Sequence, residues 1–162
     1  MTTPLDDLFV KTRAENRAAL IAYIPAGFPS IEGCKKVIQA FVDGGVDAIE
    51  IGFPYSDPVM DGPTIQAAAD RSLAQGTGAK EVFQALKVAT DAGVAAVVMT
   101  YWNPIEKYGV ENSLVNAAGD LALRGGLLKG GEVTPWEIGI RNPEIKDEIV
   151  ESFKINTGAI AI

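Results

Sequence analysis

Three short apolar runs, each separated from the next by a stretch with helical spacing, constrain the fold of this chain more than any other feature. The runs are AALIAYI (18–24), VDAIEIG (46–52) and VAAVVMTY (94–101). Continuous apolar strands are typical of sheets buried on both faces, and parallel strands need crossover connections that are usually helices. The first hundred residues are therefore predicted to form βα units around a parallel sheet.

The segments between these runs carry helix signals. Thr3 and Ser30 are good N-cap residues, and the apolar residues that follow each of them recur with helical spacing. The predicted helices cover residues 4–14, 31–43, 63–73 and 79–92.

The pattern changes after Gly109. Three segments there have alternating character and are separated by Gly-Gly and Asn-Pro pairs, which predicts short antiparallel strands. They are SLVNAAGDLALRGG (113–126), TPWEIGIRNP (134–143) and ESFKINTGAIAI (151–162). No long helix is expected here, apart from a turn around 144–150.

Composition excludes several classes of function. The chain has no histidine, which excludes histidine-based catalysis and histidine metal sites. A net charge of −7 without a basic cluster argues against nucleic-acid binding. No apolar run reaches the roughly 18 residues of a membrane span, and the acidic N-terminus does not resemble a secretory signal. Cys34 is the single cysteine, which favours a reducing cytoplasm, and we expect it to be a small apolar filler.

An acid inside the second apolar run indicates chemistry. Strand alternation places Glu50 on one face and Ile49 and Ile51 on the other, and a carboxylate in such a run is costly unless it has a task. A second acid, Asp61, follows a loop rich in Gly and Pro. Two interpretations stay open for each acid: Glu50 is catalytic or an ion-pair partner, and Asp61 is catalytic or the N-cap of the next helix.

Three motifs resemble the alpha subunit family of tryptophan synthase over residues 1–111. They are AYIPAGFP (22–29), EIGFPYSDPVMDGPTIQAA (50–68) and MTYWNPIEKYGVE (99–111). The enzyme of that family is a (βα)8 barrel that cleaves indole-3-glycerol phosphate to indole and glyceraldehyde 3-phosphate. The resemblance implies an α/β fold, namely a partial (βα)8-type barrel of three βα units with an N-terminal helix. A β-rich segment over 112–162 would complete it and pack on 1–111 as one domain.

The same resemblance implies roles for individual residues. Glu50 would be the catalytic acid and base, and Asp61 the second catalytic acid. Tyr23 and Tyr101 would lie beside the indole pocket, although from the residues alone both are interpreted as packing residues. The loop that would dock on the beta subunit contains Pro54, Asp57 and Pro58. No cofactor and no metal are implied.

The C-terminal strands resemble a different family. SLVNAAGDLALRG, PWEIGIRNP and FKINTGAIAI are similar to an internal segment of the FAD:protein FMN transferases over residues 113–162. That family usually has Asn-Ala-Gly-Gly-Asp, and Ala118 stands here for one glycine. A turn between strands explains Asn116 and Asp120 equally well. Two partial families in one chain suggest a recombined or engineered chimera.

We therefore expect a lyase of tryptophan synthase alpha descent with absent or very weak activity. In this barrel class the loops after strands seven and eight bind the phosphate, and no residue here matches them. The alternatives are a non-catalytic chimera whose only property is folding, and flavin binding by the C-terminal segment. The expected partners are indole-3-glycerol phosphate, the beta subunit, or a second copy that closes two half-barrels on each other.

Overall fold

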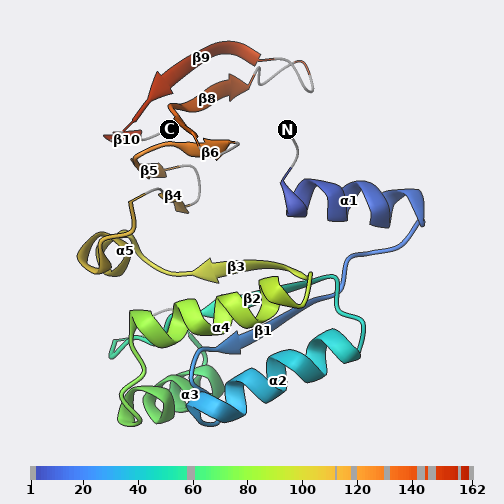
Figure 1. Ribbon diagram of the computed structural model, residues 1–162, viewed down its shortest axis with the longest axis vertical. Coiled ribbons are helices and arrows are strands. Elements are labelled where there is room, and N and C mark those ends of the chain that lie inside the picture. Colours follow the sequence, from blue (N-terminus) through green and yellow to red (C-terminus); the bar gives the residue numbers. More distant parts are fainter. Residues whose placement is uncertain are drawn as a thin grey trace. The chain divides into compact units, whose positions relative to one another are not determined.

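A three-stranded parallel sheet forms the centre of the N-terminal part of the computed structural model (Figure 1). The structure describes residues 3–57, 61–111, 113–117, 120–129, 132–141, 145, 149–156 and 158–160. The chain divides into two units, residues 1–100 and 101–162. The first unit is an α/β fold, as the alternation of apolar runs and helices predicts.

The elements of the first unit follow the predicted order. They are α1 (Pro4–Ala14), β1 (Ile21–Pro25), α2 (Ile31–Asp43), β2 (Ala48–Gly52), α3 (Pro63–Ala74), α4 (Ala79–Asp91) and β3 (Ala95–Met99). The strands lie in the order β1-β2-β3, and both pairings are parallel. Helices α2 and α4 pack on each other, and α4 also contacts β2 and β3 (Figure 1).

Side-chain caps explain why the first helices begin where the sequence predicts. The Thr3 hydroxyl accepts a hydrogen bond from the Asp6 backbone N–H, while the Asp6 carboxylate accepts one from the Thr3 backbone, which is a complete capping box. Ser30 caps α2 in the same way through the Gly33 N–H, at 3.0 Å. In α3 the cap is Gly62, without a side-chain hydrogen bond, so the interpretation of Asp61 as an N-cap is wrong.

Strand β1 begins later than its apolar run, because the residues before the strand are bound to Asp47. Arg17 donates two hydrogen bonds to the Asp47 carboxylate, at 2.6 and 2.7 Å, and the Leu20 N–H donates a third, at 2.8 Å. The hydrogen bonds from Arg17 lower the pKa of Asp47 most, and the one from Leu20 lowers it further. The hydrogen bonds to Asp47 in turn raise the pKa of Arg17. This cluster ties the amino end of β1 to that of β2.

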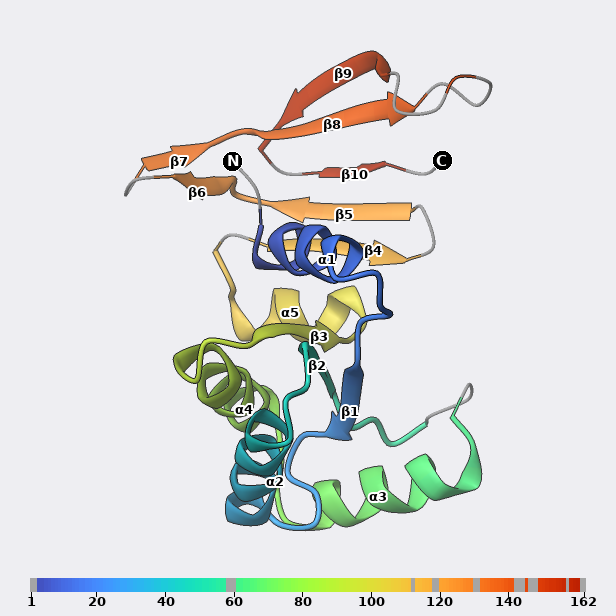
Figure 2. The ribbon, with the colours of Figure 1, turned by 90° about the vertical axis from the view of Figure 1, so that its right-hand side faces the viewer.

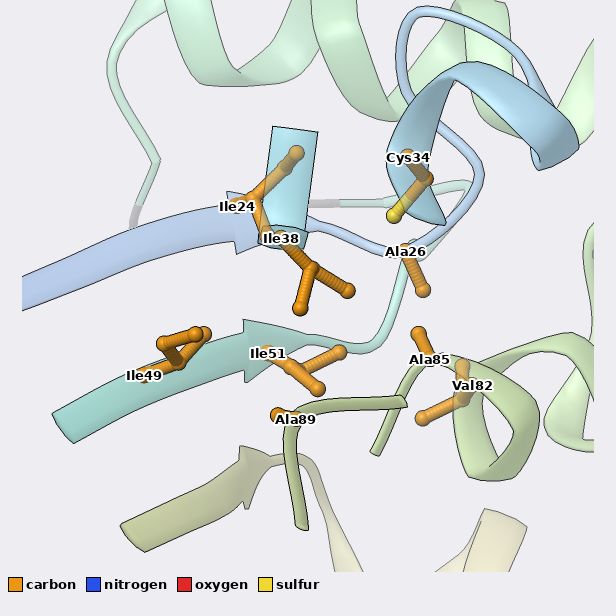
Figure 3. Packing of buried hydrophobic residues seen from close by; sticks show 9 residues of the cluster. All are labelled: Ile24, Ala26, Cys34, Ile38, Ile49, Ile51, Val82, Ala85 and Ala89. Carbon is orange, nitrogen blue, oxygen red and sulfur yellow. The ribbon is translucent and has the colours of Figure 1, made fainter. Parts of the chain in front are cut away.

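The core of the first unit lies between the sheet and helices α2 and α4 (Figure 3). Ile49 and Ile51 of β2 are fully buried in it, together with Ile38 of α2 and Val82 of α4. Cys34 is buried in the same cluster, as expected of an apolar filler, and its burial raises the pKa of the thiol. Because side chains alternate along a strand, Glu50 projects from the opposite face of the sheet.

The second unit begins with a helix and continues as strands. Its elements are α5 (Trp102–Tyr108), β4 (Ser113–Ala117), β5 (Asp120–Arg124), β6 (Leu127–Lys129), β7 (Glu132–Thr134), β8 (Trp136–Arg141), β9 (Ile149–Ile155) and β10 (Gly158–Ile160). In the described residues these strands pair antiparallel among themselves, in the groups β10-β5-β4, β6-β7 and β8-β9 (Figure 2). The antiparallel character of this segment is thus as predicted.

Two elements of the second unit were not expected from the sequence. Helix α5 interrupts the stretch after the third apolar run, and it tolerates Pro104 because the proline lies in the first turn. The second is the hairpin of β6 and β7, whose strands lie between the first two predicted strand segments. Most of the turn predicted around 144–150 lies outside the described residues. In the described part of the chain, no helix has the length and apolar character needed to cross a membrane.

Candidate functional site

The candidate site lies on the face of the sheet opposite the core, and extends from the middle of β1 and β2 toward their carboxyl ends. Tyr23 of β1 and Glu50 of β2 are partners in the parallel register, and Val97 of β3 is the next partner across. Glu50 is partly buried. Chemistry in α/β folds is commonly placed at this end of the strands.

Gly52 makes room for Tyr23. A Cβ atom at Gly52 would overlap the phenolic oxygen of Tyr23 and would lie 2.8 Å from its Cζ atom. The Tyr23 ring therefore lies against the backbone of β2, two residues beyond Glu50. A glycine inside a strand marks such close approaches, which is the one signal in the sequence that could have found this contact.

Asp61 lies in the loop that leads into α3, and its charge acts on the same phenol. It is partly buried, and its carbonyl oxygen accepts a hydrogen bond from the Gln66 side chain at 2.8 Å. Burial raises the pKa of the Tyr23 phenol, and the negative charges of Asp61 and then Glu50 raise it further. The structure thus places Tyr23, Glu50 and Asp61 near enough for the two acids to act electrostatically on one phenol.

The loop after β2 is attached to the end of β3. The Phe53 N–H donates to the Met99 carbonyl at 2.9 Å, and the hydroxyls of Tyr55 and Thr100 are 2.6 Å apart. The rings of Phe53 and Tyr55 stack with centroids 5.2 Å apart. Tyr55 and Thr100 are 45 positions apart in the sequence, and the Phe53–Tyr55 stack depends on how the loop folds. The sequence alone therefore did not predict these contacts.

The remaining predicted site residues differ in burial and in the unit to which they belong. Pro54 is buried in the loop, Asp57 is exposed, and Pro58 lies outside the described residues. Tyr101 belongs to the second unit, where it is the N-cap of α5 and is 57% exposed. The site described from the first unit therefore consists of Tyr23, Glu50 and Asp61.

Comparison with known families places the chain. The family model for the tryptophan synthase alpha chain matches residues 9–128, which is most of the sequence. The chain belongs to the tryptophan synthase alpha chain family. A second family model, that of the ApbE family, matches residues 95–162. The second match agrees with the resemblance of the C-terminal strands to FAD:protein FMN transferases, and it overlaps the first over 95–128.

Curated relatives agree with this assignment. The tryptophan synthase alpha chain of Thermobifida fusca is 54% identical over 133 residues, which are 82% of this chain and 47% of that relative. The alpha chain of Nocardia farcinica is 50% identical over 131 residues, with 81% and 47% covered. The chain thus spans about half the length of the curated relatives it matches.

Solved structures confirm the predicted partial (βα)8-type barrel. The aminoacrylate-bound form of tryptophan synthase from M. tuberculosis matches with a TM-score of 0.65 and 45% identity, over 68% of this chain and 45% of that chain. Tryptophan synthase subunit alpha from Legionella pneumophila matches with a TM-score of 0.63 and 32% identity, over 67% and 42%.

Proposed function

We propose that the first unit carries the acid pair of a tryptophan synthase alpha-type lyase, and that these 162 residues by themselves turn over substrate very weakly or not at all. Family membership supports the reaction class. The observation that carries the proposal is the position of Glu50 directly across from Tyr23 in the strand register, with the charge of Asp61 acting on the same phenol.

The proposed reaction is the retro-aldol cleavage of indole-3-glycerol phosphate. Glu50 protonates carbon 3 of the indole ring and accepts the proton of the C3′ hydroxyl. The bond between these two carbons then breaks, its electron pair returns to the ring to form indole, and the C3′–O group becomes the aldehyde of glyceraldehyde 3-phosphate. Asp61 holds the ring N–H and stabilises the positive charge that develops on the protonated ring.

Tyr23 is assigned to the wall of the indole pocket. Its half-buried ring lies on the same face of the sheet as Glu50, and its neutral phenol tolerates both carboxylates. Tyr101 is proposed as a second residue of that pocket, on the resemblance alone.

The weakness of the reaction follows from the span of the chain. In this barrel class the phosphate is bound after strands seven and eight, and the described residues of the first unit form three strands. Without phosphate binding at those loops, less binding energy is available to position the reacting carbons.

Indole release from indole-3-glycerol phosphate tests the proposal, with the Thermobifida fusca alpha chain assayed alongside. We expect a rate at least about a thousandfold below that relative, since poor positioning alone removes several kcal/mol of barrier lowering. Residual turnover should vanish in Glu50→Gln and Asp61→Asn and persist in Asp70→Asn, which changes an exposed acid of α3. A rate comparable with the relative, or residual turnover that is independent of Glu50, contradicts the proposal.

The loop after β2 is the proposed docking surface for a tryptophan synthase beta chain. Asp57 is exposed there, and the Tyr55–Thr100 contact holds the loop beside it. Asp57→Lys should weaken co-elution with a beta chain in size-exclusion chromatography. Equal co-elution of Asp57→Lys and the unchanged chain contradicts this assignment.

The C-terminal segment has a second candidate function, flavin binding, which the ApbE family match favours. Asn116 and Asp120 lie on the paired strands β4 and β5, on either side of a two-residue connection. Titration of FAD against the fluorescence of Trp102 and Trp136 tests this candidate. Unchanged emission at saturating FAD rejects it.

The two family matches also support the proposal that the chain is a chimera of two partial families. An intact genomic reading frame that encodes the same fusion argues against a recombined origin.

A further inference from the structure

The sequence contains two Asp-Gly pairs, Asp43-Gly44 and Asp61-Gly62. In such a pair the backbone nitrogen of the glycine can attack the carboxyl carbon of the aspartate side chain, because glycine has no Cβ atom to hinder the approach. The attack closes a succinimide ring. The structure holds the two pairs in different environments, and this difference determines where the reaction can occur.

The first pair is held in a helical turn. Asp43 is the last residue of α2, and the Gly44 N–H donates a hydrogen bond to the Ala40 carbonyl at 2.9 Å. The Asp43 carboxylate accepts a hydrogen bond from the Gln39 side chain, also at 2.9 Å. Both reacting groups thus have partners, and both are released only when the last turn of α2 opens.

The second pair lies where the loop enters α3. Gly62 is the N-cap of that helix, so its N–H has no partner within the helix, and no described residue accepts a hydrogen bond from it. Gly62 is exposed, and a Cβ atom built on it would meet no described atom within 4 Å. The nitrogen and the space around it are therefore open to ring closure.

The Gln66 side chain acts on the same peptide group. It donates a hydrogen bond at 2.8 Å to the Asp61 carbonyl, which belongs to the amide that contains the Gly62 nitrogen. A hydrogen bond to the carbonyl polarises the amide and makes its N–H proton easier to lose. The Gly62 carbonyl accepts hydrogen bonds from the Ile65 and Gln66 N–H groups, both at 3.0 Å, so the first turn of α3 holds the pair in this position.

We propose that Asp61-Gly62 is a site of spontaneous aspartate isomerisation in the folded chain. The Gly62 nitrogen forms a bond to the Asp61 Cγ atom and loses its proton, and one carboxyl oxygen leaves as water. Solvent water then adds to one of the two carbonyl carbons of the ring. Breaking the bond between Cγ and nitrogen returns aspartate. Breaking the bond between the Asp61 backbone carbonyl carbon and nitrogen gives isoaspartate, whose main chain continues through Cβ and Cγ.

Isoaspartate at this position would move the second acid of the site. The negative charge is kept, but the carboxylate is then attached directly to Cα and the main chain is one carbon longer. The carboxylate that acts on Tyr23 would therefore be displaced. This consequence for the lyase rests on the proposed function, whereas the isomerisation itself does not.

Mass spectrometry of the aged chain tests the proposal. Trypsin cleaves after Lys36 and Arg71, so a single peptide, residues 37–71, contains both pairs. The folded 162-residue chain is incubated at neutral pH in water enriched in oxygen-18, and electron-transfer fragmentation of the peptide locates isoaspartate. We expect isoaspartate to form at Asp61 at least about tenfold faster than at Asp43, because Asp43 reacts only after local opening of α2. Each product should carry one oxygen-18 atom from ring hydrolysis.

Unfolding and two matched variants supply the controls. In urea the two pairs should react at similar rates, since α2 no longer protects Asp43. Gly62→Ala should slow the reaction at Asp61 because its methyl group hinders ring closure, whereas Gly44→Ala, the same change at the other pair, should leave that reaction unchanged. Circular dichroism checks that both variants fold.

Three outcomes overturn the proposal. In the first, the two pairs react equally fast in the folded chain, or Asp61 does not react. In the second, isoaspartate forms without oxygen-18 or as fast in Gly62→Ala as in the unchanged chain. In the third, the preference for Asp61 persists in urea, which would show that the flanking sequence and not the fold selects it.

Indole release by the same aged samples separates this proposal from the lyase. Residual release that falls as isoaspartate accumulates at position 61, and that is preserved in Gly62→Ala, supports both. Isoaspartate at position 61 without any change in residual release leaves the isomerisation intact and counts against Asp61 as a catalytic acid.

Discussion

At the scale of single residues, the site depends on a position that has no side chain. A Cβ at Gly52 would overlap the phenol of Tyr23, and the Tyr23 ring has little freedom to move because it is half-buried. We expect Gly52→Ala to lower the free energy of unfolding by about 1–3 kcal/mol, the usual cost of overpacking. Urea denaturation of Gly52→Ala and of the unchanged chain measures this difference in the free energy of unfolding.

The matching control is the same substitution in a Tyr23→Ala background. There the added methyl group no longer meets the phenol, so most of the cost should disappear, as in a double-mutant cycle of two residues in contact. Equal costs in the two backgrounds would show that Tyr23 does not lie over Gly52.

A second residue-scale prediction concerns acid stability. Hydrogen bonds from Arg17 and Leu20 hold the pKa of Asp47 well below its ordinary value. A carboxyl with a lowered folded-state pKa contributes stability that is complete above its unfolded pKa of about 4 and is lost as the pH falls toward the folded-state pKa. The difference in stability between the unchanged chain and Asp47→Asn should therefore be largest at neutral pH and shrink below about pH 4.

Denaturation at a series of pH values checks this, with Asp91→Asn as the control. Asp91 pairs with Lys87 on the exposed surface of α4, at 2.7 Å, and exposed pairs contribute little. A difference for Asp47→Asn that stays constant from pH 7 to pH 2 would contradict the role of its charge.

At the scale of elements, local signals explain what the sequence could predict. Helices α1 and α2 have their predicted bounds because Thr3 and Ser30 make hydrogen bonds within their own first turns. The start of β1 and the contact between Tyr55 and Thr100 were missed because they depend on partners far along the chain. Strand alternation predicted the face of Glu50, but the catalytic role proposed for Glu50 comes from the resemblance and not from periodicity.

The turn after β1 gives an element-scale prediction. Gly27 has a φ of +78°, and a Cβ there would overlap the hydroxyl of Thr77, which precedes the N-cap of α4. Gly45 has a φ of +79° but open space around it, so the two sites differ only in packing. Gly45→Ala should cost about 1 kcal/mol from backbone strain, and Gly27→Ala roughly 3 kcal/mol or more.

Thermal and urea unfolding of both variants measure the difference. A smaller cost for Gly27→Ala than for Gly45→Ala would mean that the turn does not pack against Thr77. Sequence reasoning treats these glycines alike, since both follow an element and both read as turn residues.

At the scale of the molecule, the two faces of the parallel sheet have different environments. Val98 of β3 packs on the core with α2 and α4, whereas its neighbour Val97 shares the face of Glu50 and is 37% exposed. In a complete (βα)8 barrel both faces are covered, since the second face lines a packed interior. The exposure of Val97 is therefore a property of a partial barrel.

Substituting lysine at each valine tests that organisation. Val98→Lys buries a charge in the core and should cost at least about 3 kcal/mol of the free energy of unfolding. Val97→Lys should cost less than about 1 kcal/mol, because its ammonium group reaches water and lies across from the Glu50 carboxylate. Equal, large costs would show that the Glu50 face is covered in solution.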